Sequence, residues 1–204
     1  MFNTVQKFKR RQQGFTLIEM AIVLVVIGLI LGMVYKGRQL VASAKVKNSQ
    51  AGYNKVLAGM NTFYDRYGFF PGDGCNGYTA GEPMTCTSTK NGLVYPTDTN
   101  DNTAAFFDLM TSTEILTEAD TKSSLGSDWN ATGDVNATWI YVDGADLRLV
   151  CDLDRKADDG NSDSGDIRTS ANAAQFGSST GDYTSSIDCW ELTGNAIVEL
   201  KVLP

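Results

Sequence analysis

The sequence has 204 residues and a formal net charge of −7, from 17 basic and 24 acidic residues. It contains no histidine, which excludes Ser-His-Asp and Cys-His catalysis and any metal site that needs histidine ligands. An acidic chain also argues against a nucleic-acid backbone as the main partner. Since no phosphate-binding loop and no nucleophile motif is found in the sequence, we do not expect an enzyme.

The N-terminal segment combines a basic leader with a long apolar run. Residues 15–35 carry one charge and are numerous enough to cross a bilayer as a helix. The positive-inside rule leaves the N-terminus in the cytoplasm and sends the C-terminal bulk outward. A secretory signal peptide is the alternative, but its apolar region is usually shorter, and no A-x-A-like cleavage site follows here. The basic residues of the leader, residues 1–14, are Lys7, Lys9, Arg10 and Arg11.

The helical pattern continues beyond the membrane segment. Apolar residues from Leu40 to Phe63 recur at spacings of roughly three to five, with polar residues between them. This spacing predicts an amphipathic continuation of the same helix over residues 36–67, which Gly68 and Pro71 end. We therefore expect one helix over residues 15–67, half in lipid and half on a globular head formed by residues 68–204.

Two features of the apolar run need an explanation. Glu19 is an acid in a segment where an ionised carboxylate costs about 2.5–3.5 kcal/mol at the helix centre. Such an acid is usually paired, and the alternative is that it snorkels to the headgroups. Gly28 and Gly32 have the GxxxG spacing that allows close approach of membrane helices, although together with Gly37 they could also loosen the helix.

The string QQGFTLIEMAIVLVVIGLILG resembles the class III signal and first helix of type IV pilins and type II secretion pseudopilins. The resemblance rests on a short basic leader that ends in Gly14, on Phe15, and on an acid at the fifth mature position. It implies a type IV pilin-like α+β fold, with a long N-terminal helix packed on a small antiparallel β-sheet head. It also implies that prepilin peptidase cuts after Gly14 on the cytoplasmic side and N-methylates Phe15.

The same resemblance implies a role for Glu19 and a set of partners. Glu19 would pair with the ammonium group of Phe15 in its own or a neighbouring subunit, and so select incoming subunits and set their axial stagger. The chain would form a homopolymer, or a copolymer with other pilins, with the help of prepilin peptidase and an inner-membrane assembly platform. It would be a single-pass inner-membrane precursor and then part of an extracellular pilus or a periplasmic pseudopilus.

The four cysteines contain no CxxC pair and allow three disulfide pairings. Two disulfides formed in an oxidising compartment are the natural interpretation, and four buried free thiols are the alternative. A pairing within the glycine-rich loop 69–92 closes the shortest segment, and the second pairing would then tie a helix to the sheet. The expected pairs are Cys75 with Cys86 and Cys151 with Cys189.

Periodicity and turn signals predict five elements in the head. The segment 144–158 also alternates as a strand would, but Asp143 and Asp146 resemble a helix-capping arrangement, which favours a helix. The expected elements are a helix over 104–117 capped by Asn102 or Thr103, a strand over 139–142 that ends at Asp143-Gly144, a helix over 144–158, and strands over 187–192 and 196–203 joined by a turn at 193–195.

The segment 152–166 holds six aspartates, and oxygen-rich loops can bind calcium. Its spacing does not fit an EF-hand loop. Some pseudopilins bind calcium in a C-terminal loop, so the resemblance leaves calcium as the one cofactor to consider, although a solvated acidic turn is the favoured interpretation. The candidate calcium ligands are Asp154, Asp158, Asp159 and Asp163.

These observations lead to one main functional hypothesis and two alternatives. The main hypothesis is a structural subunit of a type IV pilus-like filament. The first alternative is a pseudopilin of a type II secretion system, against which the length of the head and its two expected disulfides argue. The second is a membrane-anchored binding module that only displays the head.

Overall fold

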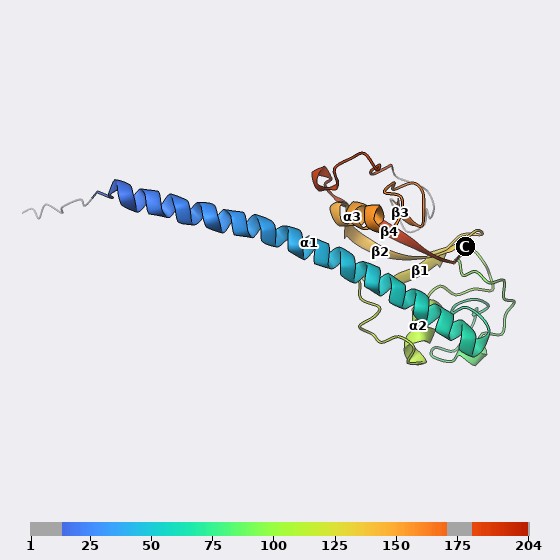
Figure 1. Cartoon of the computed structure of the whole chain (residues 1–204). Helices are drawn as coiled ribbons and strands as arrows, with labels where there is room; N and C mark the ends of the chain where they lie inside the picture. The colour runs from blue at the N-terminus through green and yellow to red at the C-terminus, as the bar shows by residue number, and fades with distance from the viewer. Residues whose placement is uncertain (1–13, 171–180, 204) are drawn as a thin grey trace, which may run out of the picture. The chain divides into compact units, whose positions relative to one another are not determined.

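The computed structural model describes residues 14–170 and 181–203, and this part of the chain divides into two compact units between Val41 and Ala42. The first described element, α1 (Leu17–Tyr67), is a single helix that begins in the first unit and ends in the second (Figure 1). It starts two residues later than predicted. Its end matches the prediction, because Gly68 adopts a φ of 80° and donates its N–H to the Tyr64 carbonyl.

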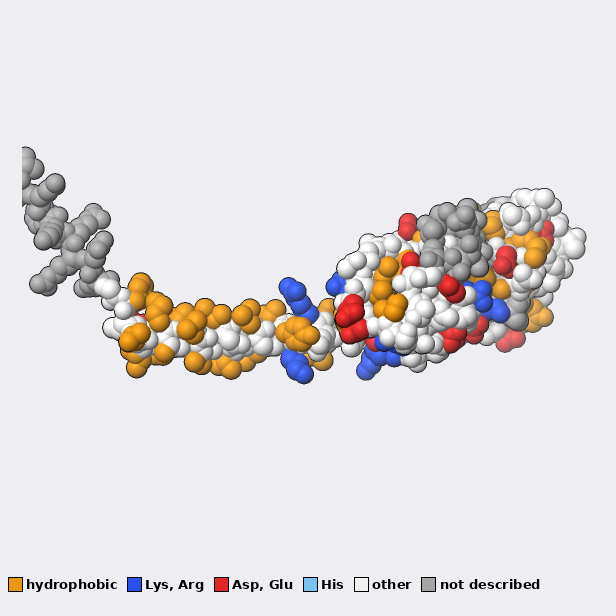
Figure 2. Space-filling model, turned by 90° about the horizontal axis from the view of Figure 1, so that it is seen from above, with side chains coloured by type: hydrophobic (Ala, Val, Ile, Leu, Met, Phe, Trp, Pro, Cys, Tyr) orange, Lys and Arg blue, Asp and Glu red, His pale blue; other side chains and the backbone are white. Residues whose placement is uncertain are grey.

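The described side chains of the first unit form no core of their own. Every described residue from Gly14 to Val41 is exposed except Gly37, which is half-buried. Figure 2 shows this stretch of α1 covered with hydrophobic side chains. By length and composition, α1 is the one helix among the described residues that could cross a membrane. This stretch therefore has the exposure expected of a segment that is covered by lipid or by other helices.

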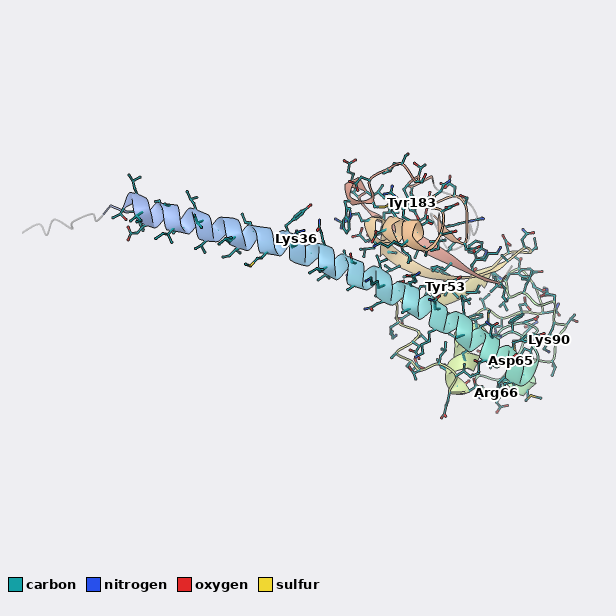
Figure 3. The ribbon with its side chains drawn as sticks, in the orientation of Figure 1. Lys36, Tyr53, Asp65, Arg66, Lys90 and Tyr183 are labelled. Carbon is teal, nitrogen blue, oxygen red and sulfur yellow. A yellow bond between two sulfur atoms is a disulfide. The ribbon has the colours of Figure 1, made fainter. Side chains whose placement is uncertain are left out.

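The second part of α1 belongs to the core of the second unit. Its buried residues recur along one face, as the amphipathic pattern predicts. Tyr53 lies on this part of α1 (Figure 3), and its hydroxyl donates to the carbonyl of Lys201. Gly52 faces the indole of Trp129. The buried residues of this face are Ala42, Val46, Ser49, Val56, Gly59, Met60 and Phe63.

A four-stranded antiparallel sheet forms the centre of the second unit. Its strands are β1 (Asn130–Gly133), β2 (Thr138–Asp146), β3 (Ile167–Ser170) and β4 (Asn195–Leu203), in the order β1-β2-β4-β3. In Figure 1 these strands lie beside the second part of α1. The expected fold class, a long N-terminal helix packed on a small antiparallel sheet, is confirmed.

Both predicted head helices are present but shorter than expected. Helix α2 is Ala105–Ser112 rather than 104–117, and it ends because Glu114 adopts a φ of 58°. No side chain caps the N-terminus of α2, although Asn102 accepts a hydrogen bond from the N–H of Ala104. Helix α3 is Leu147–Ala157, and the Asp146 side chain caps it by accepting from the N–H of Arg148.

The prediction of the strands is partly wrong. The predicted strand 139–142 continues through Gly144, which adopts a φ of 70° within a register shift between β2 and β4. The predicted strand 187–192 is instead the 3₁₀ helix η2 (Cys189–Glu191), because the Asp188 side chain accepts from the N–H of Trp190. The predicted hairpin turn at 193–195 therefore joins no strand pair, and β4 pairs with β2 and β3.

Two short strands and one 3₁₀ helix were not predicted. β1 and β2 form a hairpin whose turn is held by Asp134, which accepts from the N–H groups of Asn136 and Ala137. β3 pairs with the far side of β4. The 3₁₀ helix η1 (Pro83–Thr85) interrupts the glycine-rich loop that was correctly predicted after α1.

The expected disulfides are both formed, Cys75 with Cys86 and Cys151 with Cys189. The first closes the loop after α1. The second joins α3 to η2. We expected it to tie a helix to a strand of the sheet, but it ties α3 to a 3₁₀ helix. No cysteine of the chain is left free.

Gly133 provides a test of how closely β1 approaches the neighbouring loops. A Cβ atom there would lie 2.5 Å from the Val94 carbonyl oxygen and 2.7 Å from the Ala137 carbonyl oxygen. Gly133→Ala should therefore lower the free energy of unfolding by about 2 kcal/mol, a typical cost of overpacking. Urea unfolding of the full chain in detergent, followed by tryptophan fluorescence, measures this change.

The matched control is Gly52→Ala, since a Cβ at Gly52 meets its nearest atom at an ordinary 3.6 Å and alanine favours a helix. This control should leave the free energy of unfolding unchanged or raise it. Equal losses in the two variants would contradict the packing described for β1.

Candidate processing and assembly site

The start of α1 is held by reciprocal hydrogen bonds between Thr16 and Glu19. The N–H and the hydroxyl of Thr16 donate to Glu19 Oε2 at 2.8 and 2.9 Å, and the N–H of Glu19 donates to Thr16 Oγ1 at 3.3 Å. This arrangement is a capping box, which satisfies N–H groups that the first turn of a helix otherwise leaves without partners. In the chain that still carries its leader, Glu19 therefore has a partner within its own helix.

The predicted cleavage bond lies immediately before this cap. Gly14, Phe15 and Thr16 precede the helix, and Phe15 is 80% exposed. No heavy atom lies within 4 Å of the position that a Cβ of Gly14 would occupy. Because a protease needs an accessible segment outside regular structure, the bond between Gly14 and Phe15 is open to attack.

The predicted close-approach motif forms a shallow groove on α1. Gly28 and Gly32 lie along it with Gly37, and the groove has a volume of about 520 Å³. The helix is continuous through all three glycines, so they do not loosen it in this structure. The other residues that line the groove are Leu29, Met33, Lys36 and Leu40.

Far from this segment in the sequence, the acidic loop after α3 is organised by its own carboxylates. Asp154 is buried and accepts from the N–H of Gly160 at 3.0 Å and from the hydroxyl of Tyr183 at 2.9 Å. Tyr183 is labelled in Figure 3. Asp158 accepts from the N–H groups of Asp166 and Ile167, where β3 begins. These acids therefore hold the loop between α3 and β3 in place.

The structure brings three of the four candidate calcium ligands together. Oxygens of Asp154, Asp158 and Asp159 lie within 4.8 Å of one another, so they could share a cation, whereas Asp163 is not part of this group. Asp163 instead accepts from the hydroxyl of Ser162 and the N–H of Gly181. The three clustered acids also accept hydrogen bonds from their own loop, which gives them a structural role that needs no ion.

Burial raises the pKa of Asp154 to about 6, and the nearby charges of Asp158 and Asp159 add to this effect. Tyr183 donates to the same carboxyl group, and its own pKa is raised, mainly by burial. Ionisation of Asp154 is thus costly in the folded chain. This cost makes the stability of the head sensitive to pH.

A second pair of carboxylates holds the loop that follows α1. Asp73 accepts from the N–H groups of Asn91 and Gly92, and Asp101 accepts from those of Gly74 and Tyr95. Burial raises the pKa of Asp101 to about 6 and raises that of Asp73 as well. The sequence analysis did not identify either residue, because single aspartates in a glycine-rich loop give no spacing signal.

Thr16 was also missed, although the sequence holds a signal for it. Residues 16–19 read T-L-I-E, the Ser/Thr-x-x-Glu pattern of a capping box in front of an apolar run. The sequence analysis considered Glu19 as a partner of the amine of Phe15 or as an acid that snorkels to the headgroups, but not as part of a cap. The structure adds that Glu19 already accepts two hydrogen bonds before any cleavage.

Comparison with known proteins supports the assignment of this segment. The family model described as the prokaryotic N-terminal methylation motif matches residues 9–35, which include Gly14, Phe15 and Glu19. The expectation that the N-terminal segment carries a methylation signal is thereby confirmed, and the segment suits a membrane-anchored precursor.

Among solved structures, the chain is similar to the major type IV pilin PilA1 from Clostridium difficile, with 14% sequence identity and a TM-score of 0.46. The similarity covers 80% of this chain and 97% of the pilin. A search of curated proteins gives no match.

The raised pKa of Asp154 predicts a pH dependence of stability. The folded chain binds a proton at Asp154 below about pH 6, whereas an unfolded aspartate does so only below about pH 4. Between these pH values the folded state holds one proton more than the unfolded state at this residue. The contribution of Asp154 to the free energy of unfolding therefore falls as the pH rises, and it is lowest above pH 6.

Asp154→Asn should remove about 2 kcal/mol of this fall while keeping the acceptor for the N–H of Gly160. Urea unfolding of the full chain in detergent at pH 4 and pH 7 measures it. Asp101→Asn should remove a similar share, since Asp101 has a pKa of about 6 too. If the free energy of unfolding falls between pH 4 and pH 7 in both variants as much as in the wild type, neither carboxyl group has the raised pKa described above.

A calcium titration tests the metal expectation separately. The clustered acids already accept hydrogen bonds from their own loop. We therefore expect calcium to change the Tm of the full chain no more than magnesium does. Asp159→Asn is the matched variant, since it removes a charge but keeps an acceptor for the N–H of Asn161. A rise in Tm that calcium alone causes, and that this variant weakens, would instead establish a cation site.

Proposed function

We propose that this chain is a structural subunit of a type IV pilus-like filament, cleaved after Gly14, N-methylated at Phe15 and polymerised through α1. One observation carries the proposal: the methylation motif of residues 9–35 coincides with the part of α1 whose side chains are exposed. A motif that prepares an N-terminus for assembly is thus joined to a helix that needs other apolar surfaces to cover it.

Cleavage would change the partner available to Glu19. Hydrolysis of the bond between Gly14 and Phe15 leaves an ammonium group on Phe15, one helical turn from Glu19. In a low-dielectric surrounding an opposite charge is a stronger partner for a carboxylate than neutral N–H and hydroxyl donors. Glu19 would then exchange its bonds to Thr16 for the amine of its own or a neighbouring subunit.

This exchange explains how a costly acid can favour assembly. A carboxylate that keeps only its capping bonds remains charged in hydrocarbon, where ionised groups are destabilised. A neighbouring amine neutralises that charge, and it does so only where two subunits meet at one axial offset. The pairing would therefore favour correctly staggered, processed subunits, while the apolar side chains of α1 supply most of the contact area.

The partners follow from the same scheme. The chain would begin as a single-pass precursor in the inner membrane, with prepilin peptidase acting at Gly14 and an assembly platform adding subunits to a homopolymer or copolymer. The acidic heads would then face solvent on an extracellular pilus. We assign the chain no catalytic role.

A pseudopilin of a type II secretion system is the second candidate, since the methylation motif fits it equally. The two disulfides and the length of the head favour the pilus. A membrane-anchored binding module would leave the methylation motif without a purpose, and is therefore the least supported candidate.

Mass spectrometry of sheared surface filaments tests the proposal. We expect the chain as a peptide that starts at N-methyl-Phe15, and we expect Glu19→Ala to be cleaved normally but absent from filaments. Thr16→Val is the matched control, because it removes the hydroxyl of the capping box and leaves the carboxylate of Glu19 for the amine. This control should still enter filaments.

Two results would count against the proposal. Normal filaments from Glu19→Ala would rule out a role for the ion pair in assembly. Equal loss of filaments in Thr16→Val and Glu19→Ala would show that Glu19 acts through its capping bonds and not through pairing with the amine.

A further inference from the structure

The membrane segment of α1 ends in a ring of aromatic and basic side chains. Tyr35 is 66% exposed, and Lys36 and Arg38 are exposed beside it. From Leu17 to Tyr35 the helix rises about 28 Å, close to the thickness of the hydrocarbon core of a bilayer. A helix that starts at one face of the membrane thus places these three residues at the headgroups of the other face.

Lys36 and Arg38 have no carboxylate partner in the part of the chain that the structure describes. The ion pairs there involve Lys55, Lys122, Arg148 and Lys156 instead. Along the helix itself, the sequence contains no acid between Glu19 and Asp65. The two basic side chains therefore need anions that come from outside α1.

The direction of the two side chains indicates which anions these are. Residues two positions apart on an α-helix point about 200° apart, so Lys36 and Arg38 project from opposite sides of α1. Figure 2 shows Lys and Arg side chains on both sides of the helix where its hydrophobic stretch ends, and Figure 3 shows Lys36 pointing away from the helix axis. A single partner helix meets one face, whereas lipid headgroups surround the helix on all sides.

We propose that Tyr35, Lys36 and Arg38 form a collar that binds anionic phospholipid headgroups of the outward-facing leaflet. Tyrosine favours the membrane interface, and basic residues next to an anionic surface each contribute attraction to it. The inference rests on the membrane placement of α1 that the proposed function includes, but it requires no filament.

Processing would give this collar its importance. The four basic residues on the cytoplasmic side, Lys7, Lys9, Arg10 and Arg11, all lie in the leader that cleavage after Gly14 removes. The amine of Phe15 and the carboxylate of Glu19 then cancel at the inner end. Among residues 15–41, Lys36 and Arg38 would then carry the charges that have no opposite partner. The mature chain would be held at its outer face, and no basic side chain would have to cross the bilayer when the chain moves outward.

The test uses the unassembled chain after cleavage at Gly14, so that the basic residues of the leader cannot hold anionic lipid, in nanodiscs that contain equal amounts of phosphatidylglycerol and phosphatidylcholine. Native mass spectrometry then reports which lipids stay bound. We expect preferential retention of phosphatidylglycerol, which Lys36→Gln and Arg38→Gln should each weaken about fivefold and which high salt should also weaken. The control Lys122→Gln with Lys156→Gln removes two basic residues from the head and should retain phosphatidylglycerol as the wild type does.

Equal retention of phosphatidylglycerol by the wild type and both single variants would overturn the collar. So would variants that keep this lipid but no longer enter filaments, because the two bases would then contact neighbouring subunits. A chain that retains phosphatidylglycerol through the collar but is never found in filaments would leave this inference standing and overturn the proposed function.

Discussion

The first part of α1 presents a large exposed apolar surface. Sixteen large apolar side chains between Phe15 and Tyr35 are exposed. Burial of one such side chain stabilises a protein by about 1.5–3 kcal/mol, so water is an unfavourable surrounding for this segment. It needs lipid or other helices around it, and the same surface suits both, because lipid chains and leucine side chains are similarly apolar. In the proposed function, a subunit would therefore pass from membrane to filament without refolding.

Apolar surface alone specifies no register, and the polar atoms at the start of α1 supply it. Before cleavage the carboxylate of Glu19 is occupied by Thr16, so the helix has a defined first turn and its acid has partners. In the proposed function, cleavage would give the same carboxylate an amine that the uncleaved chain does not have. The capping box and the proposed ion pair would thus use the same carboxylate oxygens in two states of the chain. An uncleaved subunit, with no free amine at Phe15, would then lack the partner that Glu19 needs for assembly.

Elements that depend on interactions between neighbours in the sequence could be predicted from the sequence, whereas elements that depend on pairing between strands could not. The span, the amphipathic half of α1 and the cap of α3 at Asp146 depend on neighbours in the sequence, and all were predicted. The Cys75–Cys86 pairing was predictable because its loop is short. The strands β1 and β3 have four residues each and largely polar sequences, so only their pairing with β2 and β4 makes them strands.

The prediction of a strand at 187–192 was wrong because interactions other than strand pairing decide the conformation of this segment. Its apolar residues favour a strand, but a local cap at Asp188 and the disulfide of Cys189 to α3 decide the conformation. At the candidate site, Gly14, Phe15 and Glu19 came from a linear motif, whereas Asp73 and Asp101 act on backbone N–H groups that the fold brings to them. No pattern of spacing could have identified them.

The acids of the head combine two properties that would otherwise conflict. Residues 68–204 hold 22 acidic and seven basic residues, which keeps the head soluble but makes neighbouring heads repel one another in the proposed filament. Several of these acids are turned inward to accept backbone N–H groups in loops that lack regular structure, with Asp101 and Asp154 at a raised pKa as the cost. The head thus uses charge to order its loops and to stay in solution, and it contributes little apolar surface to assembly. In the proposed filament, attraction between subunits would then come from α1, which carries no acid between Glu19 and Asp65.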